Sequence, residues 1–357
     1  MKKILAIIVA LATTMAFATA CNEKTEVSDT TASEVETSDT EASEDTEATE
    51  PSTAESDMLD RAGNGIVLPE KVDRIVSMAP STTQVLIEIG LADKIIGADT
   101  NSTASYDTQL PSLVAGFDMM SPDCELIASL EPDIVFTSGM SSVGGTSPFQ
   151  SLIDSGICVA DIPSSASIAD IAEDIRFIGI VTGKESEAED LVEAMTLYIS
   201  AVEDIAKTVP EGETKTVLLM MNVPSAEYPT IYTVGTGTYM DEMFGIIGAK
   251  NAFGDQEGWL AISIEEALAA DPDVILMDCN WMPDAAEQVK VLEGWENVNA
   301  VKNGDVYQID EDACSRPNHH ISDATIEWAK CIYPDTYGDF SKSFNDIKDD
   351  VLEQVLG

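Results

Sequence analysis

The densest group of chemically capable side chains lies near the C-terminal end of the chain. Residues 315–320 read SRPNHH and include one of four arginines and both histidines. A guanidinium pairs with carboxylates and other anions. An imidazole hydrogen-bonds a ligand or takes an open position on iron or cobalt. We therefore predict that Arg316 contacts a ligand and that His319 or His320 does so too. In the structural alternative His320 caps the next helix and Arg316 holds a carbonyl or an acid.

Further candidates follow the predicted strands, because ligands of α/β domains lie beyond the carboxyl ends of the strands. Aromatic and methionine side chains with a few polar groups suit a large, partly apolar ligand. A bare cation requires clustered carboxylates and imidazoles instead, so we predict no metal held directly by the protein. In the alternative, individual aromatic side chains pack the core. The predicted ligand-binding residues are Met78, Pro80, Ser81, Thr82, Tyr106, Phe117, Asp118, Met119, Met140, Tyr228, Tyr239, Trp259 and Trp281, beside Asn101 and Asn280.

The elements that must position these side chains alternate between strands and helices. The predicted strands are apolar on both faces, which is typical of parallel sheets covered by helices. A helix after residue 81 and one over 240–247 have N-cap or Gly stop signals. The sequence LEPDIV at 130–135 is echoed by ADPDVI at 270–275, which indicates two related halves. The predicted strands cover residues 74–80, 95–99, 133–137, 158–162, 216–222, 231–234, 273–278 and 306–309.

A long helix is predicted between the two halves, over residues 183–209. Its apolar residues recur mostly at steps of three or four, and neither Gly nor Pro interrupts it before Pro210. Its roughly 25 residues would span roughly 37 Å at about 1.5 Å each. We predict an N-terminal lobe over 61–182 and a C-terminal lobe over 210–357, held nearly rigid by this helix.

The N-terminus predicts export. Lys2 and Lys3 precede a short apolar stretch, and small residues at 18–20 precede Cys21. The stretch is too short to span a membrane comfortably. This pattern resembles a bacterial lipoprotein cleavage box, in which the Cys is acylated, although Ala18 replaces the usual Leu. We predict a signal peptide over 1–20 and a lipidated Cys21; the alternative is an ordinary signal peptide with an incidental Cys. Residues 21–60 are almost all small, polar or acidic, which predicts a disordered, extended tether.

Charge and cysteine content exclude several classes. The formal net charge is −47, and this argues against nucleic acid as a partner and against broad adsorption on anionic lipid. Beyond Cys21 the five cysteines are widely spaced without a C-x-x-C motif, so neither a dense disulfide scaffold nor a zinc site is predicted. We expect most of them to be buried as small apolar residues. They are Cys124, Cys158, Cys279, Cys314 and Cys331.

Five stretches in order resemble the bacterial binding proteins for iron–siderophore complexes, haem and cobalamin: RIVSMAPSTTQVLIEIGLADKIIGAD, VAGFDMMSPDCELIASLEPDIVFTSG, YTVGTGTYMDEMFGIIGAKNAFGD, ISIEEALAADPDVILMD and GDVYQIDEDACSRPNHHISDA. The resemblance implies an α/β fold of two Rossmann-like lobes with mostly parallel sheets, joined by one long helix, with ligand between them. It implies no intrinsic cofactor. The transported ligand would be an iron–siderophore, cobalamin or haem, and the acidic composition slightly favours a near-neutral corrinoid. With such a ligand, His319 or His320 would make a hydrogen bond or an axial contact to the chelated metal. The His pair departs from the Pro-Arg pair common in the family, which leaves the ligand open.

The resemblance also implies partners. The chain would be a monomer anchored by lipid to the outer face of the cytoplasmic membrane, working with a permease dimer and a cytoplasmic ATPase. One carboxylate on each lobe would dock onto permease arginines, which is physically sound because opposite charges steer association. Glu125 fits the first position. Gly245 occupies the nearest equivalent of the second, so Asp241 and Glu242 are the candidates there. The alternative is that all three are simply solvated acids.

Three rival classes remain open. An enzyme lacks support, because no G-x-S-x-G occurs, the histidines are adjacent, and TVGTGTYMD lacks the Lys of a P-loop. A manganese or zinc receptor of similar architecture needs three or four His and carboxylate ligands from both lobes. A sensor or adhesin lipoprotein is the third.

Overall fold

The computed structural model describes residues 58–142, 147–210 and 212–356, with the backbone alone for 353–356. These residues belong to one compact unit. The predicted signal peptide, Cys21 and the tether up to residue 57 lie outside the described residues. No helix in the described part is both long and apolar enough to cross a membrane.

The first sheet has five parallel strands in the order β5-β4-β3-β6-β7. The four predicted strands of this half are confirmed, and the short edge strand β5 was not predicted. Strands β3 and β6 are buried along their whole length, which explains why their sequences are apolar on both faces. The elements are β3 (Ile75–Ser77), α2 (Pro80–Glu88), η1 (Ala92–Lys94), β4 (Ile95–Asp99), α3 (Thr100–Ser105), β5 (Ala115–Phe117), α4 (Cys124–Ser129), β6 (Ile134–Thr137), α5 (Gln150–Asp154), β7 (Cys158–Asp161) and α6 (Ile168–Thr182).

The second sheet has four parallel strands in the order β10-β8-β12-β13. Ser263 caps α9 in a capping box, and Thr238 caps α8, which ends at the left-handed Gly248 as predicted. The elements are β8 (Thr216–Met220), α8 (Tyr239–Ile247), β10 (Lys250–Asn251), α9 (Ile264–Ala270), β12 (Val274–Met277), α10 (Ala285–Lys290), η2 (Trp295–Asn297), α11 (Asn299–Asn303), β13 (Val306–Gln308), α12 (Glu311–Cys314), α13 (Ile321–Ile332) and α14 (Pro334–Tyr337).

One strand of the second half departs from the expected scheme. Strand β9 (Ile231–Val234) exists where predicted, but it pairs antiparallel with β11 (Trp259–Ile262) in a separate two-stranded ribbon. Only residues 221–230 link β8 to β9, and they contain no helix. A parallel neighbour would need a crossover of about a dozen residues or more, so the short link does not allow it.

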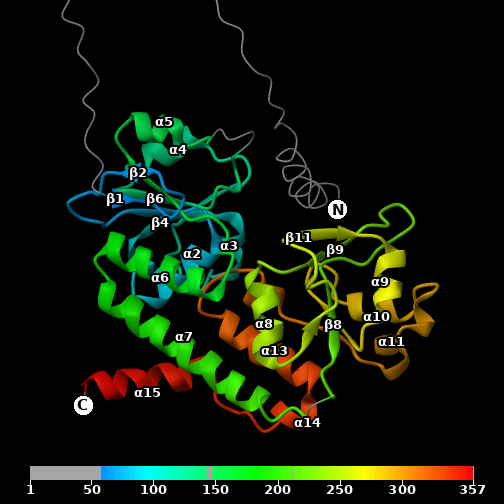
Figure 1. Cartoon of the computed structure of the whole chain (residues 1–357). Helices are drawn as coiled ribbons and strands as arrows, with labels where there is room; N and C mark the ends of the chain where they lie inside the picture. Colours follow the sequence, from blue (N-terminus) through cyan, green and yellow to red (C-terminus); the bar gives the residue numbers. More distant parts are fainter. Residues whose placement is uncertain (1–57, 143–146, 211, 357) are drawn as a thin grey trace, which may run out of the picture. The chain divides into compact units, whose positions relative to one another are not determined.

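The predicted long helix is α7 (Glu185–Ala206), slightly shorter than expected. It packs along α6, and it also contacts α8, α13 and the C-terminal helix α15 (Phe344–Leu356). Gly179 permits the close approach to α6, because a Cβ there would lie 2.5 Å from the Cβ of Ala188. Figure 1 shows α7 leading away from α6 toward α8 and α14. One buried apolar cluster contains residues of both sheets and of α7, so the two lobes share a core along this helix.

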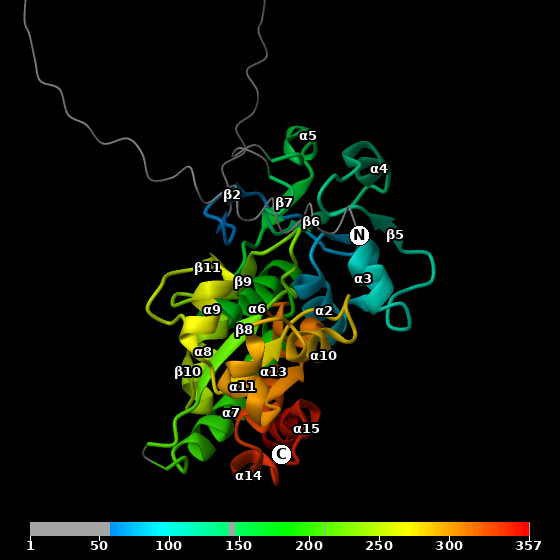
Figure 2. The same ribbon diagram turned by 90° about the vertical axis from the view of Figure 1, so that its right-hand side faces the viewer.

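Both ends of the described chain contact the first lobe, although the C-terminal helix α15 packs mainly along α7. Residues 58–60, assigned above to the tether, are ordered: β1 (Met58–Leu59) pairs with β2 (Gly65–Ile66), and buried Asp60 accepts a hydrogen bond from the Asp161 amide. Helix α15 was not predicted, and its Lys348 forms an ion pair with Glu88 of α2. Figures 1 and 2 agree in placing α14 and α15 at the end opposite to α4 and α5.

Candidate functional site

A pocket of about 410 Å³ lies where the two lobes face each other. On the first-lobe side it is formed by residues that follow β3, β4, β6 and β7 and by α6. On the second-lobe side it is formed by α12 and the residues after it. This placement agrees with the rule that ligands lie beyond the carboxyl ends of parallel strands. The lining residues are Ala79, Pro80, Ser81, Thr82, Val85, Asn101, Met119, Ser138, Met140, Ile162, Pro163, Ser164, Ser165, Asp174, Ile175, Ile178, Glu311, Asp312, Ser315, Arg316 and Pro317.

The lining of this pocket differs in character from the expected one. Two methionines and several serines are present, but none of these described lining residues is aromatic. Of the predicted ligand-binding residues, the structure brings six to the pocket: Pro80, Ser81, Thr82, Met119, Met140 and Arg316. Asn101, which follows β4, also lines it.

The other first-lobe candidates lie beside or behind the pocket. Tyr106 is buried directly behind it, and its hydroxyl accepts a hydrogen bond from Arg316. Met78 and Phe117 are buried at the ends of their strands. Asp118 is exposed, and its carboxylate accepts hydrogen bonds from the amides of its own loop, so it has a local structural role.

The second-lobe aromatic residues do not line the pocket. Tyr228 and Trp281 are 46% and 43% exposed, and Trp259 lies half-buried in β11. Tyr239 is 0% exposed, and its hydroxyl donates to the carbonyl oxygen of Cys314 at 2.8 Å. A side chain without exposed surface cannot contact a ligand in this conformation, so we remove Tyr239 from the site.

The histidine pair also lies away from the pocket. His319 is 0% exposed, and neither ring nitrogen has a hydrogen-bond partner among the described residues. The centre of its ring lies 4.2 Å from the ring centre of His320 and 5.1 Å from that of Phe344. Phe344 belongs to helix α15, which was not predicted. Burial holds the pKa of His319 well below its usual value, because the imidazolium would lose its hydration. His320 is half-buried and pairs with Asp323 at 2.8 Å. Neither histidine is among the described residues that line the pocket, and buried His319 cannot contact a ligand in this conformation.

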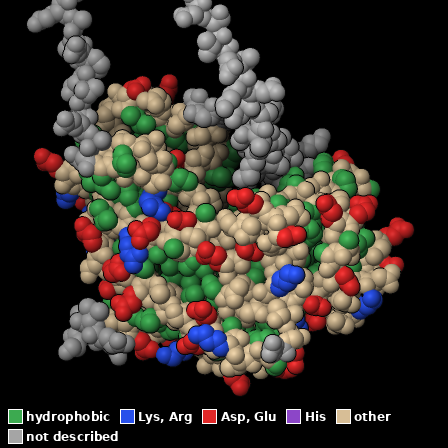
Figure 3. Space-filling model, viewed as in Figure 1, with side chains coloured by type: hydrophobic (Ala, Val, Ile, Leu, Met, Phe, Trp, Pro, Cys, Tyr) green, Lys and Arg blue, Asp and Glu red, His purple; other side chains and the backbone are tan. Residues whose placement is uncertain are grey.

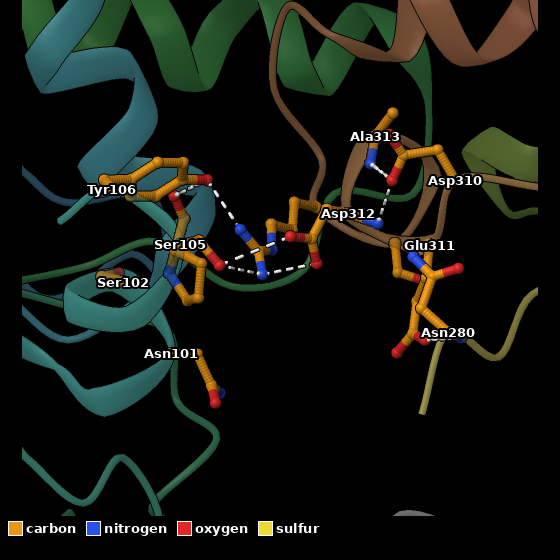
Figure 4. A network of polar contacts seen from close by, with 12 residues as sticks. Asn101, Ser102, Ser105, Tyr106, Asn280, Asp310, Glu311, Asp312 and Ala313 are labelled. Carbon is orange, nitrogen blue, oxygen red and sulfur yellow. Dashed lines mark hydrogen bonds and ion pairs between the residues drawn. The ribbon is translucent and has the colours of Figure 1, made fainter. Parts of the chain in front are cut away.

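Arg316 links the two lobes across one edge of the pocket. Its guanidinium donates to the Tyr106 hydroxyl at 2.9 Å and to Ser105 Oγ at 3.0 Å, and it lies 2.5 Å from an Asp312 carboxylate oxygen. Its carbon Cζ also lies 5.5 Å from the centre of the Tyr106 ring. Figure 4 shows Ser105 and Tyr106 of the first lobe facing Asp312 of the second, joined by dashed lines. The structural alternative for Arg316, an acid partner, is therefore present here.

The second-lobe wall is acidic. Glu311 lines the pocket, and its carboxylate accepts a hydrogen bond from the backbone N–H of Asn280 at 2.5 Å. Behind it Asp278 is buried at the end of β12, where Ser315 Oγ donates at 2.7 Å and Cys314 Sγ at 3.2 Å. Burial raises the pKa of Asp278 to about 7 and also raises the pKa of Glu311. The sequence analysis missed these acids, although Glu311 follows a strand in the same way as the residues it selected.

A third carboxylate enters the pocket from α6. Asp174 lies on the pocket-facing side of that helix, 2.5 Å from Nε of Arg61 and 2.7 Å from Ser165 Oγ. No sequence signal distinguishes Asp174, because one acid inside an amphipathic helix resembles a solvated residue.

The candidate docking carboxylates differ in their surroundings. Glu125 is exposed in the first turn of α4. Asp241 is half-buried and accepts a hydrogen bond from Asn251 Nδ2 at 2.8 Å, while Glu242 accepts one from the Ile168 amide at the start of α6. Gly245 is exposed on α8. Both second-lobe acids are thus held by partners within the chain.

Metal-binding side chains do not cluster in the described part of the chain. No group of three or more His, Cys, Asp and Glu residues there could hold a metal ion. The five cysteines of residues 58–356 are free, three of them buried. The manganese or zinc receptor alternative is not supported by this arrangement.

Comparisons with known proteins agree with the fold. The family model described as "Periplasmic binding protein" matches residues 75–313. An uncharacterized ABC transporter substrate-binding lipoprotein of Bacillus subtilis, YvrC, is 31% identical over 278 residues, 78% of this chain and 85% of that protein. A Fe(3+)-citrate-binding protein of B. subtilis is 23% identical over 55% of this chain and 59% of that protein. A solved structure of a possible iron-binding, periplasmic solute-binding protein from Staphylococcus epidermidis is 27% identical, with a TM-score of 0.63, covering 74% of this chain and all of that one. The chain therefore belongs to the periplasmic binding protein family, as a substrate-binding protein of an ABC importer with two α/β lobes.

Proposed function

We propose that the protein captures a metal chelate outside the cytoplasm and delivers it to a membrane permease. The observation that carries this proposal is the pocket of about 410 Å³ lined by both lobes. A ligand that contacts both lobes stabilises their closed arrangement, and a permease can recognise that arrangement. Relatives named for ferric citrate and for iron support a chelate as cargo. An iron–siderophore, a cobalamin or haem would enter as transported ligand, not as an intrinsic cofactor.

The size and lining of the pocket bear on this choice. Ligand pockets commonly measure about 300–1,000 Å³, so this pocket is at the smaller end. None of its described lining residues has an aromatic ring that could stack on a flat macrocycle, and methionine, serine and proline are present instead. A compact iron chelate suits this lining better than a corrinoid, which reverses the slight preference drawn from composition.

Anchoring and docking complete the proposal. Cys21 would carry the lipid, and the acidic segment after it would hold the binding unit away from the membrane. Binding proteins of this kind work with a permease dimer and a cytoplasmic ATPase. Glu125, exposed on α4, is the proposed first docking carboxylate, and Asp241 and Glu242 remain the second-lobe candidates. We propose a monomer without catalytic activity, since the relatives are named as binding proteins. The comparisons do not favour a sensor or an adhesin.

Calorimetry tests the proposal. The full chain, extracted in mild detergent, is titrated with ferric siderophores, cobalamins and haem, and saturable one-to-one binding of at least one is expected. Ser164→Trp places a bulky ring on an exposed part of the pocket wall and should abolish that binding. Ser341→Trp, exposed and outside the pocket, is the control. Binding of none of these ligands, or equal binding by both variants, would contradict the proposal.

A further inference from the structure

The ionisable side chains of the pocket suggest which charge its ligand carries. Three carboxylates line it, those of Asp174, Glu311 and Asp312, against a single guanidinium, that of Arg316. None of these described lining residues is Lys or His. The excess of carboxylates also agrees with the wider surface, where acidic side chains are spread over the face shown in Figure 3 with fewer Lys and Arg between them.

Two of the three carboxylates already have cationic partners. Asp174 lies 2.5 Å from Nε of Arg61, which does not line the pocket. Asp312 lies 2.5 Å from the guanidinium of Arg316. Each of these charges is therefore compensated by a contact within the protein itself.

Arg316 is not left free to receive an anion. Its side chain is only 14% exposed, and its terminal nitrogens donate to Tyr106 and Ser105 of the first lobe while Asp312 holds them from the second. An anionic ligand would have to displace Asp312 from this guanidinium and then lie beside that released carboxylate. Arg316 thus connects the two lobes, because its charge is paired with Asp312 and its N–H donors bind Tyr106 and Ser105.

Glu311 is the lining carboxylate that has no direct ion pair among the described residues. Within the part of the chain that the structure describes, no ion pair includes it, and its hydrogen bond comes from the neutral Asn280 amide. Figure 4 shows Glu311 and Asn280 on the opposite side of the network from Asn101 of the first lobe, and both Glu311 and Asn101 line the pocket. Asp278 lies behind this wall, and the carboxylates of Asp310 and Asp312 flank Glu311 in sequence. Burial raises the pKa of Glu311, and the charges of Asp312 and Asp310 add to this effect. The hydrogen bond from the Asn280 backbone and the more distant charge of Arg316 lower the pKa but do not cancel the rise, so the ionised form of Glu311 is disfavoured.

We propose that the ligand has no net negative charge and places a cationic N–H group against the Glu311 carboxylate. Such a group would compensate the one lining charge that the protein leaves unpaired. Anionic chelates would instead meet uncompensated carboxylate charge at the second-lobe wall. This inference rests on the proposed function, since it names the charge class of the metal chelate that the pocket takes.

A panel of metal complexes sorted by charge tests the inference. Ferrioxamine B and aquocobalamin are cationic, ferrichrome and cyanocobalamin are neutral, and ferric dicitrate and haemin are anionic. Each is titrated calorimetrically into the full chain in mild detergent at low salt. We expect the tightest binding from a cationic complex, weaker binding from neutral ones and the weakest from anionic ones. An anionic complex bound as tightly as the best cationic one would overturn the inference while leaving the proposed function intact. Binding of none would overturn the proposed function, and the inference with it.

A variant pair then localises the effect. Glu311→Gln removes the charge and keeps the shape, so affinity for the bound cationic complex should fall about 10- to 100-fold, as for a lost charged hydrogen bond. The loss should be smaller for a neutral complex. Glu193→Gln on the exposed face of α7 makes the same change in net charge away from the pocket, and it should leave affinity unchanged. Unchanged affinity in Glu311→Gln, or an equal loss in both variants, would overturn the assignment to Glu311.

Discussion

Replacing His319 with Leu should stabilise the protein, and increasingly so at acidic pH. The imidazole is fully buried between His320 and Phe344, and both ring nitrogens lack a hydrogen-bond partner among the described residues. An unsatisfied buried polar atom costs about 1–3 kcal/mol, while an apolar side chain of similar volume avoids that cost. A repacking cost of about 1 kcal/mol offsets part of this gain. We therefore expect His319→Leu to raise the free energy of unfolding by about 1–2 kcal/mol at pH 7.

Burial of His319 also makes the free energy of unfolding depend on pH. The pKa of folded His319 is well below the usual value of 6.5, so below about pH 6.5 the unfolded chain binds a proton that the folded chain does not. Stability then falls with decreasing pH, by about 1.4 kcal/mol per pH unit for one proton. From pH 7 to pH 5 wild type should lose about 2 kcal/mol from this group alone. The Leu variant lacks that loss, so its advantage should grow by the same amount.

Urea unfolding at pH 7 and pH 5, followed by tryptophan fluorescence, measures both effects. The other titrating groups are shared by wild type and variant, so the difference between their curves isolates His319. His320→Gln is the matched control, because the neighbouring side chain is half-exposed and hydrogen-bonded to Asp323. A destabilised Leu variant whose stability changes with pH in parallel with wild type would show that His319 is paired or accessible, and the reasoning would be refuted.

Two further predictions concern the core. Folded Asp278 has its pKa raised to about 7, so the folded chain holds a proton that the unfolded chain releases above about pH 4, and stability should fall as pH rises from 4 to 7. In urea unfolding, the free energy of unfolding of Asp278→Asn relative to wild type should therefore rise by about 2 kcal/mol between pH 5 and pH 7. The same variant-minus-wild-type difference at both pH values would contradict this. Gly179→Ala places a methyl 2.5 Å from Ala188 Cβ and should cost about 1–3 kcal/mol by forcing α6 from α7. Gly245→Ala, with open space around it, should stabilise α8 by about 0.5–1 kcal/mol, and a thermal melt in which both variants shift the same way would contradict the packing argument.

Local pattern was sufficient for most of the architecture. The apolar runs at 95–99, 133–137 and 158–162 predicted strands that the structure contains at nearly the same bounds. Parallel strands end at one edge of a sheet, so residues after them were predicted to meet there. Pro80, Ser81 and Arg316 all line the pocket, although Arg316 lies more than 230 residues after Pro80 in the sequence.

Which side chains line the pocket at that edge was decided by tertiary packing. Asp174 enters the pocket from α6, whose orientation no local pattern reveals. Glu311 follows strand β13 as the predicted site residues follow theirs, but only the packing of α12 shows that this acid lines the pocket. The histidine pair had the right residue types in the right loop, yet helix α15 covers it from the far end of the chain.

Composition and the spacing of apolar residues determined the fold class, the parallel sheets and the edge at which the pocket lies, because these depend on burial patterns within short segments. Tertiary structure alone decided what each polar side chain does there. Arg316, predicted to contact a ligand, lines the pocket, and its guanidinium pairs with Tyr106 and Asp312. The physical reason is that ion pairs and hydrogen bonds within the protein offset the charge of a side chain before it can act on a ligand. The residues that make these contacts come from distant parts of the chain.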